Sequence, residues 1–304
     1  RYWRDWSSDV CSSDLGPRDA PSVSGYEIIA VESDYALRLA SLKSQALYPD
    51  LALLMPTSGS TGSPMMVRQS AQNLLANAES IALSLDLGIE DRAITTLPMF
   101  YTYGLSIINS QLAAGGSIVL NEYSLMDRLF WSKLSDTSPT YFGGVPYTYE
   151  VLHRLGVRRL KDSTIRMLTQ AGGKLKPEIV SAVHEVAEAI GIEFHVMYGQ
   201  TEATARMSVL HSSEVAARPR SIGKPIPKGN FRVVDPESGI ELPVGTEGEL
   251  EYSGPNVALG YASSAIDLNE GDTFCGHLRT GDLAYCDAEG FYYITGRLKR
   301  FLKL

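Results

Sequence analysis

Short apolar runs alternate with amphipathic segments through the first two thirds of the chain. Each run has the length of a buried strand and is bounded by polar or turn-forming residues. Predicted strands cover residues 26–31, 51–55, 93–97, 117–120, 165–169 and 192–197, and predicted helices cover residues 35–47, 70–88, 105–113 and 177–190. Strands separated by helices predict a mostly parallel sheet that is covered on both faces.

Two of these helices carry clear signals at their ends. Ser70 is a candidate N-cap for a helix whose apolar face is followed by Gly88, a residue that favours helix ends. That face consists of Leu74, Leu75, Ala78, Ile81, Ala82 and Leu85. Pro177 suits the first turn of a later helix, which we expect to end before Gly191.

The pattern changes near Ser221. Beyond it, Gly and Pro separate short β-rich runs, and no segment predicts a helix. These runs cover residues 231–234, 248–252, 283–285 and 291–294. We therefore expect an α/β fold with a mostly parallel sheet layered with helices over residues 16–220, followed by a small β-rich subdomain over residues 221–295.

Residues 1–15 do not contribute to the predicted fold. The tripeptide Ser-Ser-Asp at positions 7–9 recurs at positions 12–14, and the whole string resembles a translated sequencing adaptor. We expect a non-native tail here, with the native beginning of the protein lost. A disordered polar tail is the alternative, and neither interpretation assigns the segment a function.

Composition narrows the classes of function. The chain has 304 residues, 44% of them hydrophobic, and 27 Lys and Arg against 35 Asp and Glu give a net charge of −8. This charge disfavours a general nucleic-acid surface. No apolar run approaches the ~18 residues that a membrane span needs, and there is no secretory signal. The cysteines, Cys11, Cys275 and Cys286, lack the spacing of a metal site or a disulfide framework, so we expect a reduced, cytoplasmic setting.

A polar loop follows the strand predicted at 51–55 and precedes the helix that begins near Ser70. It consists of Thr57, Ser58, Gly59, Ser60, Thr61 and Gly62. Glycines permit close backbone approach, and consecutive N–H groups with hydroxyls can surround phosphate oxygens. The spacing fits neither a Walker loop nor the dinucleotide-binding Gly-x-Gly-x-x-Gly. A flexible surface linker is the alternative interpretation.

A second polar peptide follows the strand predicted at 192–197. It reads Tyr198, Gly199, Gln200, Thr201, Glu202. Ligands of parallel sheets collect beyond the carboxyl ends of strands, so this peptide and the loop at 57–62 are expected at one rim. Tyr198 offers a flat face for a purine, Thr201 a hydroxyl for phosphate, and Glu202 an oxygen ligand for Mg²⁺. An ordinary surface turn remains the alternative.

Two further positions suit a sugar. Asp282 lies in a tight turn that enters a strand, and its carboxylate could accept hydrogen bonds from both hydroxyls of a ribose diol. Arg297 could add a donor to the same sugar or to its phosphate. The alternatives are an Asp that caps its own turn and an Arg in a basic surface patch.

These segments together resemble the adenylate-forming superfamily, which includes acyl-CoA synthetases, aryl-CoA ligases, luciferases and the adenylation domains of peptide synthetases. The matching segments follow the order of that family and span nearly all of the chain after Gly16. They cover residues 57–64, 97–104, 171–175, 198–202, 248–261, 279–282 and 296–303.

The resemblance implies a role for each motif. The loop at 57–62 would hold the β- and γ-phosphates of ATP, and Asp282 and Arg297 would bind the ribose. Thr201 and Glu202 would serve the α-phosphate and Mg²⁺ as the catalytic pair. The residues around the base would be Gly172, Gly173, Lys174, Tyr198, Gly199 and Gln200, with Tyr198 stacked on the adenine. Lys299 would lie at a hinge to a mobile C-terminal domain.

The implied activity is ATP-dependent ligation of a carboxylic acid to a thiol through an acyl-adenylate. A carboxylate is a poor electrophile, and its adenylate carries a good leaving group. The thiol would be coenzyme A or, second, the phosphopantetheine of a carrier protein. Two alternatives stay open, namely an amino-acid adenylation domain of a modular synthetase and a non-catalytic nucleotide-binding homologue.

The chain departs from the family pattern in three places. Met65 and Met66 stand where relatives have Lys-Gly, and Arg68 is a candidate substitute for the missing phosphate-binding lysine. Tyr101 replaces the His of many acid–CoA ligases and the Asp of many amino-acid-activating members, which disfavours an amino-acid substrate. The chain ends at Leu304, inside the expected hinge, so we expect the C-terminal domain and its catalytic lysine to be missing. A fragment of this kind should bind ATP weakly and turn over little.

The resemblance also outlines an acyl pocket. Its candidate residues are Tyr101, Tyr103, Gly143 and Gly144, with Tyr141, Phe142 and Tyr147 in the same segments. Such aromatic residues could equally be ordinary core. The whole interpretation requires Ser60, Glu202 and Asp282 to line one cavity.

Overall fold

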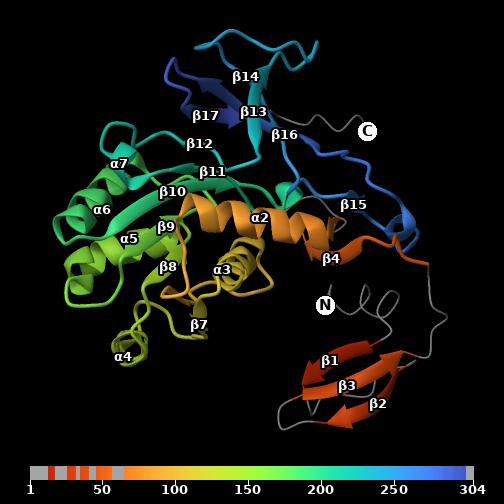
Figure 1. Cartoon of the computed structure of the whole chain (residues 1–304), viewed down its shortest axis with the longest axis horizontal. Helices are drawn as coiled ribbons and strands as arrows, with labels where there is room; N and C mark the ends of the chain where they lie inside the picture. Colours follow the sequence, from red (N-terminus) through yellow and green to blue (C-terminus); the bar gives the residue numbers. More distant parts are fainter. Residues whose placement is uncertain (1–12, 18–25, 32–34, 41–45, 57–64, 299–304) are drawn as a thin grey trace.

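A seven-stranded mixed sheet forms the centre of the molecule (Figure 1). The computed structural model describes residues 13–17, 26–31, 35–40, 46–56 and 65–298. Within the sheet, β7, β6, β8, β9 and β10 are parallel, and β11 and β12 continue it antiparallel. The strands are β6 (Arg92–Ile94), β7 (Ser117–Val119), β8 (Tyr141–Gly144), β9 (Met167–Gln170), β10 (Glu193–Gly199), β11 (Arg206–Leu210) and β12 (Lys224–Pro225).

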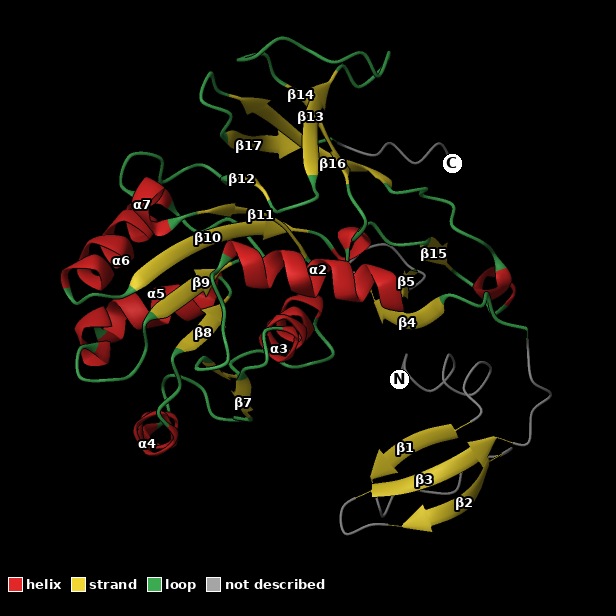
Figure 2. Ribbon diagram, in the orientation of Figure 1, coloured by secondary structure: helices red, strands yellow, loops and turns green. Residues whose placement is uncertain are grey.

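Helices cover both faces of this sheet, as predicted (Figure 2). They are α2 (Ala71–Ser84), α3 (Thr102–Ala113), α4 (Arg128–Thr137), α5 (Pro146–Leu155), α6 (Pro177–Ala189) and the short α7 (Ser212–Val215), with a 3-10 turn η1 (Val157–Leu160). Successive residues of one strand point to opposite faces. Tyr141 and Met167 therefore pack with α2 and α3, whereas Phe142 and Leu168 pack with α4, α5 and α6.

The helix predicted from Ser70 is confirmed at its start. The Ser70 hydroxyl accepts from the Asn73 amide at 3.0 Å, and the Asn73 side chain accepts from the Ser70 amide at 2.9 Å. This reciprocal pair caps the helix. The predicted end at Gly88 is wrong, because α2 ends at Ser84 and the chain reverses at Asp86, whose φ is 47°.

A strand that the sequence did not predict follows the candidate phosphate loop. β5 (Met66–Ser70) pairs antiparallel with β4 (Leu51–Pro56) on one side and with β15 (Gly260–Ala262) on the other. The expected order strand, loop, helix is therefore strand, loop, strand, helix. Pro56 pairs with Met66, so the residues flanking the loop lie next to each other. The loop itself, residues 57–64, lies outside the described residues.

The N-terminal segment forms an antiparallel sheet of β1 (Ser13–Pro17), β3 (Tyr35–Ala40) and β2 (Tyr26–Val31). The strand predicted at 26–31 is confirmed, and the helix predicted at 35–47 is wrong. Tyr35, Leu37 and Leu39 alternate with smaller or polar residues, a period that also fits a strand, and pairing with β1 and β2 decides between the two.

Most of the β-rich region after residue 221 forms a four-stranded antiparallel sheet, which lies at the top of Figure 1, whereas β12 and β15 belong to other sheets. Its strands are β13 (Asn230–Val234), β14 (Gly248–Ser253), β16 (His277–Cys286) and β17 (Tyr292–Arg297), with the 3-10 turn η3 (Ile266–Asn269) outside the sheet. Phe231 and Leu250 pack with Ala203 and Met207 of the preceding region. Among the described residues, no helix is long and apolar enough to cross a membrane.

Candidate functional site

One cleft of about 890 Å³ collects most of the predicted site residues. It lies where the carboxyl end of β10, the segment after β9, α3 and the four-stranded sheet meet. The predicted residues that line it are Tyr101, Tyr103, Gly172, Gly173, Lys174, Tyr198, Gly199, Gln200, Thr201, Glu202, Asp282 and Arg297. Glu202 and Asp282, which are far apart in the sequence, therefore share one cavity.

Some predicted residues are not brought to this cleft. Gly143 and Gly144 do not line it. A Cβ at Gly143 would lie 2.7 Å from the Tyr103 hydroxyl oxygen, so the Tyr103 side chain packs directly against Gly143. The loop residues Thr57, Ser58, Gly59, Ser60, Thr61 and Gly62, as well as Lys299, lie outside the described residues. Their roles stay predictions.

The sequence predicted that the peptide at 198–202 follows the strand, but the peptide begins inside β10. Tyr198 and Gly199 are the last residues of the strand, and Thr201 opens a 3-10 turn, η2 (Thr201–Ala203). A Cβ at Gly199 would lie 1.7 Å from the Ala205 carbonyl oxygen, so only glycine allows β11 to pass this close. The Gln69 side chain donates to the Thr201 carbonyl at 3.0 Å and thereby ties the peptide to β5.

Asp282 accepts hydrogen bonds from the β10 peptide. Its Oδ2 accepts from the Tyr198 hydroxyl at 2.6 Å and from Gln200 Nε2 at 2.8 Å. Arg297 Nε lies 3.6 Å from Oδ1. Burial, together with the charge of Asp282, raises the pKa of Tyr198 well above its ordinary value, so this hydroxyl remains a donor. The contacts join the two sheets directly at the cleft.

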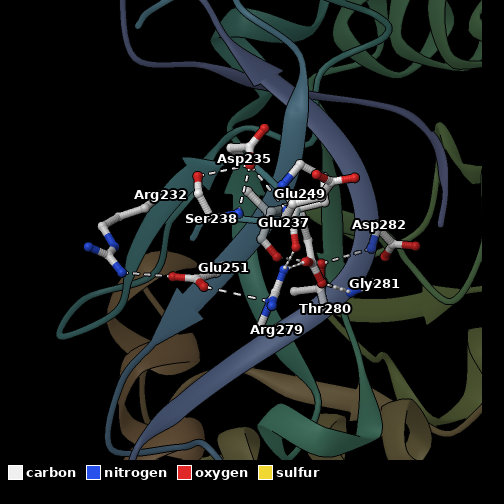
Figure 3. Close-up of polar contacts among 12 residues, drawn as sticks. Arg232, Asp235, Glu237, Ser238, Glu249, Glu251, Arg279, Thr280, Gly281 and Asp282 are labelled. Carbon is white, nitrogen blue, oxygen red and sulfur yellow. Dashed lines mark hydrogen bonds and ion pairs between the residues drawn. The ribbon is translucent and has the colours of Figure 1, made fainter. Parts of the chain in front are cut away.

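A bulge in β16 positions Asp282 (Figure 3). Gly281 has a φ of 71°, and the pairing of β14 with β16 shifts register beside it. Glu249, whose side chain is buried, accepts from the Gly281 amide at 3.2 Å and from the Arg279 guanidinium. The Thr280 hydroxyl donates to the Leu250 carbonyl at 2.7 Å and accepts from the Asp282 amide at 3.1 Å. The tight turn predicted at 279–282 is thus an anchored bulge within a strand.

Glu202 is held by Tyr261 of β15. The Tyr261 hydroxyl donates to Glu202 Oε1 at 2.7 Å, and both residues line the cleft. No group of three or more His, Cys, Asp or Glu residues that could hold a metal exists among the described residues. Tyr261 is the last residue of the segment 248–261, which resembles the family, but the sequence alone does not predict its hydrogen bond to Glu202.

Two tyrosines with different surroundings line the cleft near the start of α3. Tyr103 is buried, and its hydroxyl bonds the carbonyl and the hydroxyl oxygen of Thr169 at 2.9 and 2.8 Å, while burial raises its pKa. Tyr101 is only partly buried. A Cβ at Gly172 would lie 2.4 Å from its hydroxyl oxygen, so the bare backbone of Gly172 makes room for this ring.

The suggestion that Arg68 replaces the missing lysine is wrong. Its fully buried side chain does not line the cleft and donates to backbone carbonyls in and just before β15 and in the segment after η3. The acceptors are the carbonyls of Tyr261 at 3.0 Å, Leu259 at 3.2 Å, Gly271 at 3.1 Å, and Glu270. Arg68 thus joins β5 to the chain around β15.

Comparisons with known proteins find CoA ligases among the proteins that are similar to this chain. A 4-coumarate–CoA ligase-like protein of Oryza sativa subsp. japonica is 31% identical over 91% of this chain and 50% of its own length. A 2-succinylbenzoate–CoA ligase of Bacillus cereus is 29% identical over 95% of this chain and 57% of its own length. The chain therefore spans about half the length of the curated relatives it matches.

Solved structures show the same fold. The O-succinylbenzoate coenzyme A synthetase of Bacillus subtilis in complex with AMP matches with a TM-score of 0.70 and 29% identity, over 83% of this chain and 50% of that one. The same enzyme in complex with ATP and magnesium matches with a TM-score of 0.67 and 28% identity, over 88% and 52%. The family described as AMP-binding enzyme matches residues 18–262. With this match over most of its length, the chain belongs to the adenylate-forming, AMP-binding enzyme family.

Proposed function

We propose that the cleft binds ATP and a carboxylic acid, forms an acyl-adenylate, and passes the acyl group to the thiol of coenzyme A. The observation that carries this proposal is the convergence of the 172–174 segment, the 198–202 peptide and Asp282 on one cleft. The names of the relatives support the reaction class, because they include 4-coumarate, 2-succinylbenzoate and sulfoacetate CoA ligases.

The polar groups at Asp282 fit the ribose of a nucleoside. Oδ2 of Asp282 already accepts two hydrogen bonds, whereas among the residues that the structure describes Oδ1 has only Arg297 nearby, at 3.6 Å. Oδ1 can therefore accept from a ribose hydroxyl, with Arg297 beside the same sugar. The segment of Gly172, Gly173 and Lys174 would border the base, and Tyr198, Gly199 and Gln200 would form the opposite wall.

Glu202 would hold Mg²⁺ together with phosphate oxygens. The ion supplies charge neutralisation for the departing pyrophosphate when it is bound. Tyr261 keeps the Glu202 carboxylate oriented toward the cleft through its hydroxyl. Thr201 would contact the α-phosphate, and the loop at 57–62 would surround the β- and γ-phosphates.

Two displacements complete the proposed reaction. A carboxylate oxygen of the acid attacks the α-phosphorus, and the bond to pyrophosphate breaks. The thiolate sulfur of coenzyme A then attacks the acyl carbon, and AMP leaves. Alignment of the acid with the α-phosphate is the main task of the protein in the first step.

The sequence-based division of the chain belongs to this proposal. Residues 16–220 would carry the acyl and nucleotide surfaces, and residues 221–295 would contribute Asp282. Residues 296–304, with Lys299, would act as a hinge to a further domain, and residues 1–15 would take no part.

Calorimetric titration of the chain with ATP and Mg²⁺ tests the nucleotide site. Asp282→Asn should weaken binding about tenfold, because an amide accepts a ribose hydroxyl less strongly than a carboxylate does. The exposed Asp162 offers a matched control, and Asp162→Asn should bind ATP like the wild type. Equal affinities in all three proteins would overturn the assignment.

Acid-dependent exchange of labelled pyrophosphate into ATP tests the chemistry. A protein that contains this chain should show exchange with at least one acid of a broad panel. ATP binding without exchange for any acid would favour the non-catalytic nucleotide-binding homologue instead.

A further inference from the structure

Arg206 is a buried cation at the wall of the cleft. It lies on β11, and its side chain is 1% exposed. The guanidinium bonds α3 and neighbouring strands through neutral acceptors only. These are Ser106 Oγ at 3.1 Å, the Ser106 carbonyl at 3.0 Å, Ser110 Oγ at 3.1 Å, Tyr141 Oη at 3.4 Å and Met197 Sδ at 3.5 Å.

Arg206 has no carboxylate partner among the described residues. The other fully buried arginine, Arg68, differs in this respect, because the Glu270 carboxylate lies 3.8 Å from its guanidinium. A buried charge that is balanced only by neutral dipoles is costly. An anion that reached Arg206 would therefore be strongly favoured.

The guanidinium is within reach of the cleft. Arg206, Met197 and Tyr103 all line the cleft, and the Arg206 guanidinium lies 5.5 Å from the centre of the Tyr103 ring. The weakest partners of the guanidinium are on Nη1, namely the Tyr141 hydroxyl and the thioether sulfur of Met197. A carboxylate or sulfonate oxygen that displaced the sulfur would be a much stronger acceptor.

We propose that Arg206 selects the acid, and that the preferred substrate carries a second anionic group at the end remote from the carboxyl that is activated. This inference rests on the proposed function and names the substrate class of that cleft. The remote anion pairs with Arg206 Nη1, while the other carboxyl points toward Glu202 and the α-phosphate.

Equilibrium binding of matched inhibitors tests the proposal. The probes are acyl-sulfamoyl adenosines, which mimic the adenylate, prepared from linear diacids of several lengths, each with a free remote carboxylate or the corresponding primary amide. For at least one length, the carboxylate should bind at least about tenfold more tightly than its amide. Equal affinity of carboxylate and amide at every length would overturn the proposal.

Variants assign the preference to Arg206. Arg206→Met should bind both probes with similar affinity, and a methionine at a buried ionic position can be tolerated by the fold. Arg206→Lys keeps a positive charge and should retain part of the preference for the carboxylate probe. This variant tests the proposal even if Arg206→Met does not fold. The matched control is Arg220→Met, because Arg220 lines the same cleft but is exposed, so its removal should leave the preference intact.

Two outcomes would contradict the role of Arg206. If Arg206→Met keeps the preference for the carboxylate, another group recognises the anion. If it loses both probes equally, Arg206 only holds α3 against β11. AMP binding serves as the separate check on the nucleotide site, because AMP lacks the acyl group and should bind wild type and Arg206→Met alike.

Discussion

Substitution of Glu249 tests how the fold positions Asp282 in the proposed nucleotide site. Glu249 accepts from the Gly281 amide at 3.2 Å and from Arg279, and it has no direct contact with the cleft. Glu249→Ala leaves the Gly281 amide without its acceptor and Arg279 without its nearest carboxylate. Because Asp282 follows Gly281 directly, the change should also disorder the carboxylate proposed to bind ribose.

The magnitude follows from the two lost contacts. A buried amide that loses its acceptor costs about 1 to 2 kcal/mol of the free energy of unfolding. The Arg279 side chain is 51% exposed, so its ion pair adds only about 0.5 to 1 kcal/mol. We expect a total loss of about 1.5 to 3 kcal/mol for Glu249→Ala, and about 1 kcal/mol or less for Glu249→Gln, which keeps the acceptor.

The neighbouring Glu251 provides the control. It lies on the other side of Arg279 in Figure 3, pairs with Arg232 at 2.7 Å, and is more exposed than Glu249. Glu251→Ala should cost about 1 kcal/mol or less and leave ATP affinity unchanged. Urea unfolding measures the free energies, and calorimetry measures ATP binding. A Glu249→Ala protein with wild-type stability and wild-type ATP affinity would refute the reasoning.

Three further predictions concern protonation and catalysis. Burial lowers the pKa of His195 to about 4, below its value in the unfolded chain. The free energy of unfolding should therefore fall by about 2 kcal/mol as the pH falls from 7 to 5. Urea unfolding should show a smaller fall over this range for His195→Asn than for the wild type. Burial raises the pKa of Asp91, but hydrogen bonds from Arg166 and others outweigh it, and the net pKa is lowered. This stabilisation is fully present above the pKa of Asp91 in the unfolded chain and is lost as the pH falls through its pKa in the folded protein. Arg166→Ala should therefore lower the free energy of unfolding by about 1 to 2 kcal/mol at pH 7 and by less near pH 3. A loss of stability that does not depend on pH would contradict this prediction. Tyr261→Phe removes the hydrogen bond to Glu202 and frees that carboxylate to rotate. The rate of pyrophosphate exchange should therefore fall about tenfold, while the KM for the acid changes little. An unchanged rate would exclude a positioning role for Tyr261.

Most of the fold could be predicted from periodicity. The elements predicted at 93–97, 105–113, 117–120, 165–169, 177–190 and 192–197 correspond to β6, α3, β7, β9, α6 and β10, and the β-rich C-terminal region also follows from turn residues. The elements α4, β8 and α5, between residues 121 and 164, were not predicted. β5 was missed because Arg68, Gln69 and Ser70 are polar, yet all three are buried. Ser70 bonds the nearby Asn73, but Arg68 and Gln69 donate to the carbonyls of Leu259 and Thr201. Such partners lie far along the chain, so no local pattern reveals them.

The site divides in the same way. Motif order predicted that Glu202 and Asp282 would share a cleft, and the structure confirms it. The bond from Tyr198 to Asp282 and the support from Glu249 and Tyr261 could not be predicted. They depend on register between strands and on a bulge at Gly281, which are properties of the assembled sheets.

A crystal structure of the protein with ATP and Mg²⁺ tests the central claim most directly. The claim predicts the ribose hydroxyls at Asp282, the base beside Gly172 and Gly173, and the metal ion near Glu202. A nucleotide bound elsewhere, with Glu202 and Asp282 out of contact with it, would contradict the account.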